Sequence, residues 1–166
     1  MHAEAFAFVQ TVVTAHGVPA SVVEIGARCI NGSIRPLFHG AAYTGIDIAP
    51  GLWVDVVADG ATWQPPAPVE CVVCCEVLEH AEQAAAICAN AAAMLLPGGL
   101  FIVTAATDPR PAHSGTDGGA LRPGEFYRNV SLADLKGWLV PVFGTIRIDV
   151  DVAHGDIRAV AQKAGG

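Results

Sequence analysis

The chain has 166 residues, which fits one domain that buries a substantial core. Hydrophobic residues make up 52% of it and charged residues 15%, which excludes a disordered chain, and no apolar run approaches the ~20 residues of a membrane-spanning helix. The net charge of −7 without a basic stretch disfavours a nucleic-acid partner, and the first residues lack the basic segment of a signal peptide. We therefore expect a soluble, cytoplasmic protein without a membrane partner.

Short apolar runs separated by helical or turn segments predict an open α/β sheet with mostly parallel strands. The chain is expected to begin with a helix over Ala3–Ala15, which stops at Gly17. The expected strands of the core are Ser21–Ile25, Tyr43–Ile46, Val54–Val57, Val69–Cys74 and Leu100–Thr104. Their spacing leaves room for crossover connections between parallel neighbours.

The clearest helix is expected over Ala81–Leu96, which is rich in alanine and is followed by Pro97-Gly98-Gly99. A different connection is expected between the third and fourth strands. The segment Asp59–Pro68 contains three prolines and is too short for a complete crossover helix. We therefore predict a trimmed crossover that leaves this edge of the sheet thinly covered.

The last third of the chain begins with a long loop, Ala105–Val130, rich in glycine and proline. This loop leaves the carboxyl end of the fifth strand, where an open α/β sheet forms its ligand crevice. Ser131 starts a helix that runs to Leu139. The segments Thr145–Val152 and Ile157–Gln162 predict an antiparallel hairpin.

Three of the five cysteines crowd into the fourth predicted strand, at Cys71, Cys74 and Cys75. Because side chains alternate along a strand, Cys71 and Cys75 share one face and Cys74 points to the other. That arrangement suits small buried hydrophobic residues better than a tetrahedral zinc site. Free buried thiols also agree with a reducing compartment.

A glycine and an aspartate occupy the ends of the first two predicted strands. Gly26 follows the first strand directly, and Asp47 ends the second strand 21 residues later. An open α/β sheet builds a nucleoside site in this way, with the loop backbone against the ligand and the carboxylate on the ribose hydroxyls. Arg28 and Ile30 stand where a loop of three alternating glycines would have its second and third glycine, and the next glycine is Gly32. The dinucleotide pattern G-x-G-x-x-G is absent, which argues against a nicotinamide or flavin enzyme.

Together with Glu76-Val77-Leu78-Glu79-His80 and Leu96-Pro97-Gly98-Gly99, this pattern resembles class I S-adenosylmethionine-dependent methyltransferases over roughly residues 21–162. The resemblance implies a Rossmann-like, doubly wound sheet of seven strands, mostly parallel with an antiparallel C-terminal hairpin. It implies S-adenosylmethionine as the cofactor. One domain over 1–166 would comprise an N-terminal helix (1–20), a cofactor-binding core (21–104), a lid loop (105–130) and a helix plus hairpin (131–162).

The resemblance also implies the cofactor-binding residues. They are Glu24, Gly26, Ala27, Arg28, Gly32, Asp47, Ile48, Asp59, Gly60 and Glu76. Asp47 would bind the ribose and Asp59 the adenine amino group, although each carboxylate is also typical of an ordinary turn or helix cap. Arg28 would either brace the glycine loop or pair with the cofactor carboxylate.

Methyl transfer from a sulfonium is an in-line displacement, so positioning supplies much of the catalysis. A hydroxyl acceptor also needs a general base, and His80 and His113 are the candidates. Tyr127 in the lid is the third predicted catalytic residue, as part of the acceptor pocket. A subfamily that methylates small-RNA tails holds Mg²⁺ with a similar Glu-x-x-Glu-His cluster, but the same string occurs in metal-free members, and we predict no metal.

The sequence thus favours an S-adenosylmethionine-dependent methyltransferase that acts on a small or medium-sized acceptor, with O-methylation preferred. The alternative is a non-catalytic domain that binds S-adenosylmethionine and acts as a regulator or subunit. A nucleic-acid methyltransferase is a less favoured hypothesis. The sequence indicates neither the identity of the acceptor nor the oligomeric state.

Overall fold

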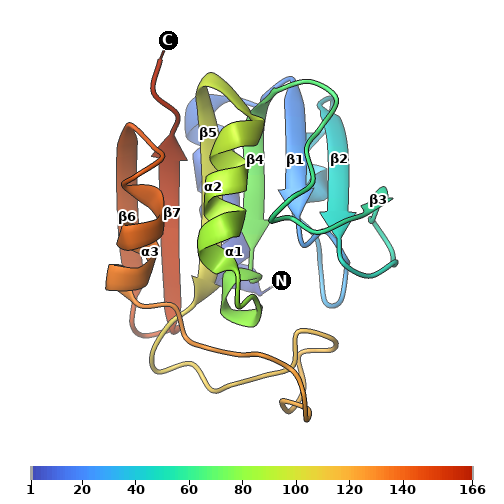
Figure 1. The fold of residues 1–166 in the computed structure, drawn as a ribbon, viewed down its shortest axis with the longest axis vertical. Coiled ribbons are helices and arrows are strands. Elements are labelled where there is room, and N and C mark those ends of the chain that lie inside the picture. Colours follow the sequence, from blue (N-terminus) through green and yellow to red (C-terminus); the bar gives the residue numbers. More distant parts are fainter. Residues whose placement is uncertain (1, 166) are drawn as a thin grey trace.

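The computed structural model describes residues 2–165 and contains a seven-stranded sheet in the order β3-β2-β1-β4-β5-β7-β6 (Figure 1). The strands are β1 Ser21–Ile25, β2 Ala42–Asp47, β3 Val56–Val57, β4 Val69–Cys75, β5 Leu95–Ala106, β6 Thr145–Asp151 and β7 Asp156–Gln162. The helices are α1 Ala3–His16, α2 Ala84–Met94 and α3 Leu132–Leu139, with short 3-10 turns η1 Arg35–Phe38 and η2 Leu78–His80.

The sheet has the mostly parallel topology that the sequence predicts. Strands β3, β2, β1, β4 and β5 pair in parallel, whereas β7 runs antiparallel to both of its neighbours, β5 and β6. The parallel central strands are nearly continuous apolar runs because helices or turns cover both of their faces. The predicted seven-stranded fold with an antiparallel C-terminal hairpin is therefore confirmed.

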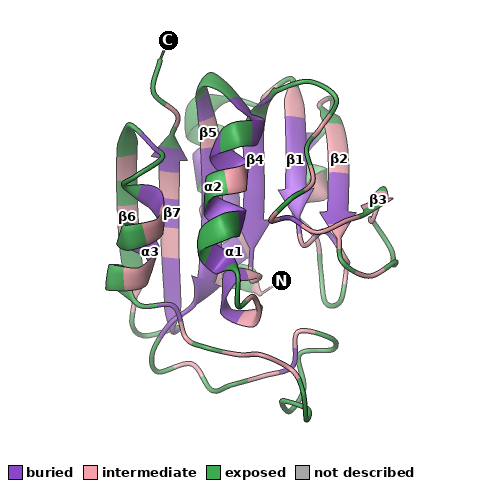
Figure 2. Cartoon of the chain, in the orientation of Figure 1, coloured by how far each residue is buried: buried purple, intermediate pink, exposed green. Residues whose placement is uncertain are grey.

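Helices α2 and α3 cover one face of the sheet, and α1 lies behind the other face (Figure 1). Two buried clusters result, one on each side of the purple central strands in Figure 2. Cys74 belongs to the cluster under α2 and α3, while Cys71 and Cys75 belong to the cluster under α1. The predicted alternation of these free, buried cysteines is confirmed.

Several predicted boundaries are wrong. The helix expected over 81–96 begins at Ala84 and ends at Met94, and the segment from Leu95 onward belongs to β5. Pro97 favours an extended residue before it, so the chain leaves the helix early and pairs with Val69 across a register shift. The strand expected over 54–57 shortens to two residues, and the segment 58–68 contains no helix, which confirms the trimmed crossover.

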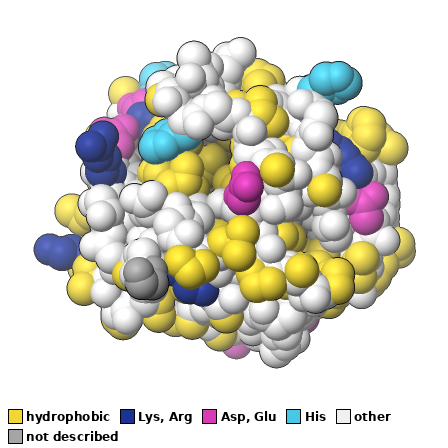
Figure 3. Space-filling model, turned by 90° about the horizontal axis from the view of Figure 1, so that it is seen from above, with side chains coloured by type: hydrophobic (Ala, Val, Ile, Leu, Met, Phe, Trp, Pro, Cys, Tyr) yellow, Lys and Arg dark blue, Asp and Glu magenta, His cyan; other side chains and the backbone are white. Residues whose placement is uncertain are grey.

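The carboxyl ends of β1, β2, β4 and β5 meet at one edge of the sheet, and the long loop 107–131 lies beside this edge (Figure 1). Figure 3, seen from above, shows the opposite end of the molecule, where hydrophobic and uncharged groups predominate and Lys, Arg, Asp, Glu and His side chains are scattered. No helix within residues 2–165 has the length and apolar character needed to cross a membrane.

Gly26 permits the close packing at the carboxyl end of β1. Its φ of +80° lies in the left-handed region, and a Cβ there would clash with Cγ2 of Val77. Val77 is β-branched and partly buried, so it has little freedom to turn away. The loop after β1 therefore requires glycine for both its backbone conformation and its space.

Replacing Gly26 with alanine is expected to destabilise the fold by about 2–4 kcal/mol, from left-handed strain plus overpacking. The matched control is Gly17→Ala, where φ is +84° but nothing lies within 4 Å of the added Cβ. Chemical denaturation should show a smaller loss of about 1–3 kcal/mol for the control, from backbone strain without overpacking. Adding Val77→Ala to the Gly26 variant should restore part of the loss, and equal losses for the two glycine variants would contradict this explanation.

Candidate active site

A cavity of about 560 Å³ lies at the carboxyl ends of the strands. One part of its wall consists of the loop after β1 and the residues that follow β2 and β3, and another consists of η2 and the lid loop. All ten residues predicted to bind the cofactor line this cavity. The fold thus gathers residues separated by up to 52 positions along the chain, from Glu24 to Glu76, around one space.

The glycine loop is held to the neighbouring strand by its backbone. The amides of Gly26 and Ala27 both donate to the carbonyl of Ile46, at 2.8 and 3.0 Å. The next amide, that of Arg28, donates to Oδ2 of Asp47 at 3.2 Å. The loop and the carboxylate that were predicted to share a ligand are therefore already joined to each other.

Asp47 has two roles open to it in this geometry. Its Oδ1 accepts from the amide of Ala49 at 3.0 Å, and its Oδ2 accepts from that of Arg28. These two hydrogen bonds are those of a turn or cap residue, the alternative role that the sequence indicated for Asp47. An ionised carboxylate has about four acceptor positions, so capacity remains for ribose hydroxyls on the cavity side.

Asp59 is likewise both a turn residue and part of the cavity wall. Its Oδ1 accepts from the amide of Ala61 at 2.8 Å, and Nε2 of Gln83 donates to both carboxylate oxygens at 3.0 and 2.9 Å. Gln83 also lines the cavity. Sequence reasoning missed this glutamine, because only the fold brings the start of α2 next to the end of β3.

Glu24 is a buried carboxyl group at the end of β1. It is 3% exposed, and the hydroxyl of Tyr43 donates to its Oε2 at 2.7 Å. Burial raises the pKa of Glu24 to about 7, although the hydrogen bond from Tyr43 opposes that rise. Tyr43 lies on the neighbouring strand, and nothing in the sequence marked it as a partner of Glu24.

Glu76 lines the cavity, but its carboxylate is engaged by protein groups. Thr104 Oγ1 donates to Oε1 at 2.9 Å, His2 Nε2 lies 2.9 Å from Oε2, and the Arg110 guanidinium also contacts Oε2. Burial alone would raise the pKa of Glu76, but the hydrogen bond with His2 and the charges of His2 and Arg110 lower it to about 2.

Arg110 also contacts the fully buried carboxylate of Asp156 at the start of β7. His2, Glu76, Arg110 and Asp156 therefore form one ionic network, and the first three of them line the cavity. Sequence reasoning missed His2, Arg110 and Asp156. They lie in segments that are remote in sequence, and none of them belongs to a recognisable motif.

Arg28 connects the glycine loop with the lid. Its Nη2 donates to the carbonyl of Gly115 at 3.2 Å. The sequence allowed Arg28 either to brace the glycine loop or to pair with the cofactor carboxylate, and this hydrogen bond corresponds to the bracing role. The lid is further ordered by Glu125, whose Oε1 accepts from the hydroxyls of Ser114 and Thr116 at 2.7 and 2.8 Å.

The three predicted catalytic residues lie together on the lid side. The ring centroids of His80 and His113 are 4.9 Å apart, and the Tyr127 ring lies 5.3 and 4.9 Å from them. His80 and His113 line the cavity, whereas Tyr127 packs against both rings and donates its hydroxyl to Asn129 at 2.7 Å. Burial and the neighbouring His113 lower the pKa of His80 to about 4, so its imidazole is neutral at physiological pH.

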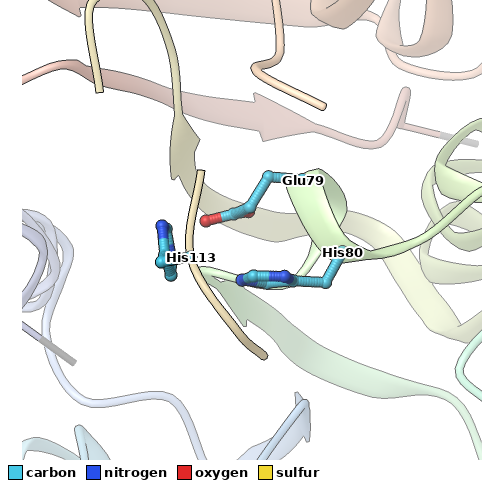
Figure 4. Close-up of side chains that lie close together, drawn as sticks. All are labelled: Glu79, His80 and His113. Atoms are coloured by element: carbon cyan, nitrogen blue, oxygen red, sulfur yellow. The ribbon is translucent and has the colours of Figure 1, made fainter. Parts of the chain in front are cut away.

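Glu79 lies behind these histidines and is fully buried. Its Oε1 accepts from the amide of Ala106 at 3.1 Å. Burial, together with the negative charge of Glu76, raises the pKa of Glu79 to about 8. One potential ligand atom from each of Glu79, His80 and His113 lies within 4.8 Å of the other two, and Figure 4 shows the carboxylate and the two rings close together.

The sequence matches the methyltransferase domain family over residues 1–140. The chain belongs to this family. The match covers the glycine loop, Asp47 and the lid, and it confirms the predicted family. Among curated proteins, no significant sequence match to this methyltransferase is found.

Solved structures share the fold of this methyltransferase. The 1,6-didemethyltoxoflavin-N1-methyltransferase of Burkholderia thailandensis, with bound S-adenosylhomocysteine, has a TM-score of 0.69 and 19% identity over 96% of this chain and 78% of its own. The N-methyltransferase NodS of Bradyrhizobium japonicum has a TM-score of 0.68 and 16% identity, and the match covers 96% of this chain and 86% of NodS. The amino pentose methyltransferase CalS10 of Micromonospora echinaspora has a TM-score of 0.69 and 14% identity, and the match covers 98% of this chain and 91% of CalS10.

Replacing Asp47 with alanine is expected to weaken binding of S-adenosylhomocysteine by about 1.5–3 kcal/mol, the range for hydrogen bonds to a charged group. The melting temperature should change little, because the two amides that Asp47 accepts from lie at a partly exposed site. Asp149→Ala in the exposed part of β6 is the control. Calorimetry that shows normal binding by Asp47→Ala, with a much lower melting temperature, would make Asp47 a structural cap only.

Proposed function

We propose that this methyltransferase transfers the methyl group of S-adenosylmethionine to a small or medium-sized acceptor, with oxygen as the preferred atom. One observation carries the proposal: the same cavity is lined by the glycine loop and Asp47 in one part and by His80 and His113 in another. A cofactor bound along the glycine loop and Asp47 would direct its sulfonium toward His80 and His113.

The proposed pose follows the chemistry of the wall. Asp47 accepts hydrogen bonds from the two ribose hydroxyls, and Asp59 with Gln83 lies at the adenine end. The close backbone of Gly26 and Ala27 adjoins the methionine portion, near Glu24. Ile48 and Gly60 contribute the apolar and backbone surface between these polar groups.

The acceptor half of the cavity is proposed to lie between η2 and the lid. His80 is a neutral imidazole there, able to accept a hydrogen bond from an acceptor hydroxyl. A base with a pKa of about 4 removes a proton weakly at neutral pH, so we expect positioning and the exclusion of water to contribute more than proton transfer. The solved neighbours include N-methyltransferases and a carbon methyltransferase, so the preference for oxygen rests on the histidines alone.

The alternative is a non-catalytic domain that binds S-adenosylmethionine and acts on a protein partner. The thin cover over β2 and β3 favours this alternative, since the segment 58–68 contains no helix. A nucleic-acid substrate is less favoured, because the net charge is −7.

Replacing both His113 and Tyr127 with alanine is expected to leave the affinity for S-adenosylhomocysteine within a few-fold and to abolish turnover. The reason is that both rings belong to the lid and pack against His80, and neither residue is among those predicted to bind the cofactor. Release of S-adenosylhomocysteine would be measured with a panel of small phenols, hydroxy acids and amines.

The control for this experiment is His39→Ala, which removes an exposed histidine that does not line the cavity. Turnover by the double variant at the wild-type rate would remove the lid from the proposed mechanism. If the wild type binds cofactor but releases no product with any acceptor, the non-catalytic alternative is favoured instead.

A further inference from the structure

Glu24 is a nearly buried carboxyl group in the wall of the cavity, next to the loop that begins at Gly26. At neutral pH, a group with its pKa of about 7 is ionised in about half of the molecules. A neutral carboxyl group forms no ion pair with an ammonium group. The groups that favour the ionised form of Glu24 therefore decide how well this part of the wall binds a cation.

Tyr43 reaches Glu24 from the neighbouring strand. Glu24 is paired with Gly45 in the parallel register of β1 and β2, so Tyr43 is its diagonal neighbour. Both side chains lie on the face of the sheet that packs against α1 and η1, because side chains alternate along a strand. The tyrosine hydroxyl donates to Oε2 of Glu24 at 2.7 Å.

The ring of Tyr43 is held in place on two sides. The centroid of the Phe38 ring lies 5.6 Å from that of Tyr43, and the guanidinium carbon of Arg35 lies 4.9 Å from it. Arg35 is itself fixed, because its Nη1 and Nη2 donate to the two carboxylate oxygens of Asp55 at 2.9 and 3.3 Å. None of these four residues lines the cavity, so Tyr43 acts on it only through Glu24.

The hydrogen bond has a defined direction. Burial and the negative charge of Glu24 raise the pKa of Tyr43, so its hydroxyl stays protonated and serves as the donor. Burial has the largest influence on the pKa of Glu24 and raises it, whereas the hydrogen bond from Tyr43 and the positive charge of Arg35 lower it. Loss of the tyrosine hydroxyl would therefore favour the neutral form of Glu24.

Other titratable groups surround the same carboxyl group. The negative charges of Asp47 and Asp55 raise its pKa. On β4, Cys75 is a neutral thiol because burial raises its pKa. His2, before α1, and Glu76, after β4, line the same cavity and are bonded to each other. Tyr43 and Arg35 are thus the groups around this carboxyl group that favour its ionised form.

We propose that Tyr43 is a positioning residue, whose hydroxyl holds the Glu24 carboxylate ready to pair with the ammonium group of the bound cofactor. The inference rests on the proposed function, which places the methionine portion of the cofactor beside Gly26 and Glu24. An ionised carboxylate has about four acceptor positions, so capacity remains for the ammonium group after Tyr43 is bound. A charge-assisted hydrogen bond of this kind is stronger than one between neutral groups.

The test measures the affinity for S-adenosylhomocysteine by calorimetry between pH 5.5 and pH 8.5. Tyr43→Phe removes the hydroxyl and keeps the ring that contacts Phe38 and Arg35. Wild-type affinity should rise with pH through 7 as Glu24 ionises. In the variant this rise should move upward by about one pH unit, so that binding is about fivefold weaker at pH 7 and within about twofold of wild type at pH 8.5.

Two controls separate this effect from a change in packing. 5′-Methylthioadenosine lacks the amino acid portion of the cofactor, so wild type and Tyr43→Phe should bind it equally at each pH. Thr44→Val removes a hydroxyl from the other face of β2, outside the cavity, and should leave both affinities unchanged.

Two further variants test the route through Glu24. Glu24→Gln should lose the rise in affinity near pH 7, and adding Tyr43→Phe to it should change the affinity less than about twofold, because the two residues act as a unit. Arg35→Gln keeps the tyrosine hydroxyl but removes a charge that favours ionised Glu24. It should shift the pH profile in the same direction as Tyr43→Phe, which gives a second readout if Tyr43→Phe folds poorly.

Identical pH profiles for wild type and Tyr43→Phe would overturn this inference alone. The same conclusion would follow from an equal loss of affinity for 5′-methylthioadenosine, or from additive effects of the Glu24 and Tyr43 substitutions. A wild type that binds neither nucleoside would instead contradict the proposed function, and this inference with it.

Discussion

The position of β1 in the sheet is the constraint on which the rest of the structure depends. It pairs in parallel with β2 on one side and with β4 on the other, so the chain leaves its carboxyl end at a point where the sheet is wound in both directions. The loop that begins at Gly26 must turn sharply there, beneath Val77. Glu24, Asp47 and Glu76 then converge around one cavity because all three strands end at the same edge.

Polar contacts across long sequence separations close this edge and hold the lid. Arg110 ties the beginning of the lid to Glu76 and to the start of β7, and Arg28 ties the glycine loop to Gly115. Each contact satisfies a charged group that would be costly to bury alone. Direct contacts therefore join the glycine loop to the lid, and the lid to the end of β4 and the start of β7.

Local patterns were enough to predict the strands, the hairpin, the trimmed crossover and the alternating cysteines, because each depends on residues close together in the sequence. They also placed ten residues that line one cavity, since parallel strands end at a common edge. They failed at Pro97, where pairing with β4 converted a helix end into strand. They also missed Arg110, whose importance comes from neighbours that only the fold supplies.

The central claim is that one cavity holds S-adenosylmethionine along the glycine loop and presents its methyl group to the side formed by η2 and the lid. A crystal structure with bound S-adenosylhomocysteine tests it most directly. The account predicts ribose hydroxyls on Asp47 and a sulfur atom that faces His80 and His113 across open space. A nucleoside bound outside the cavity, or a sulfur turned away from both histidines, would contradict it.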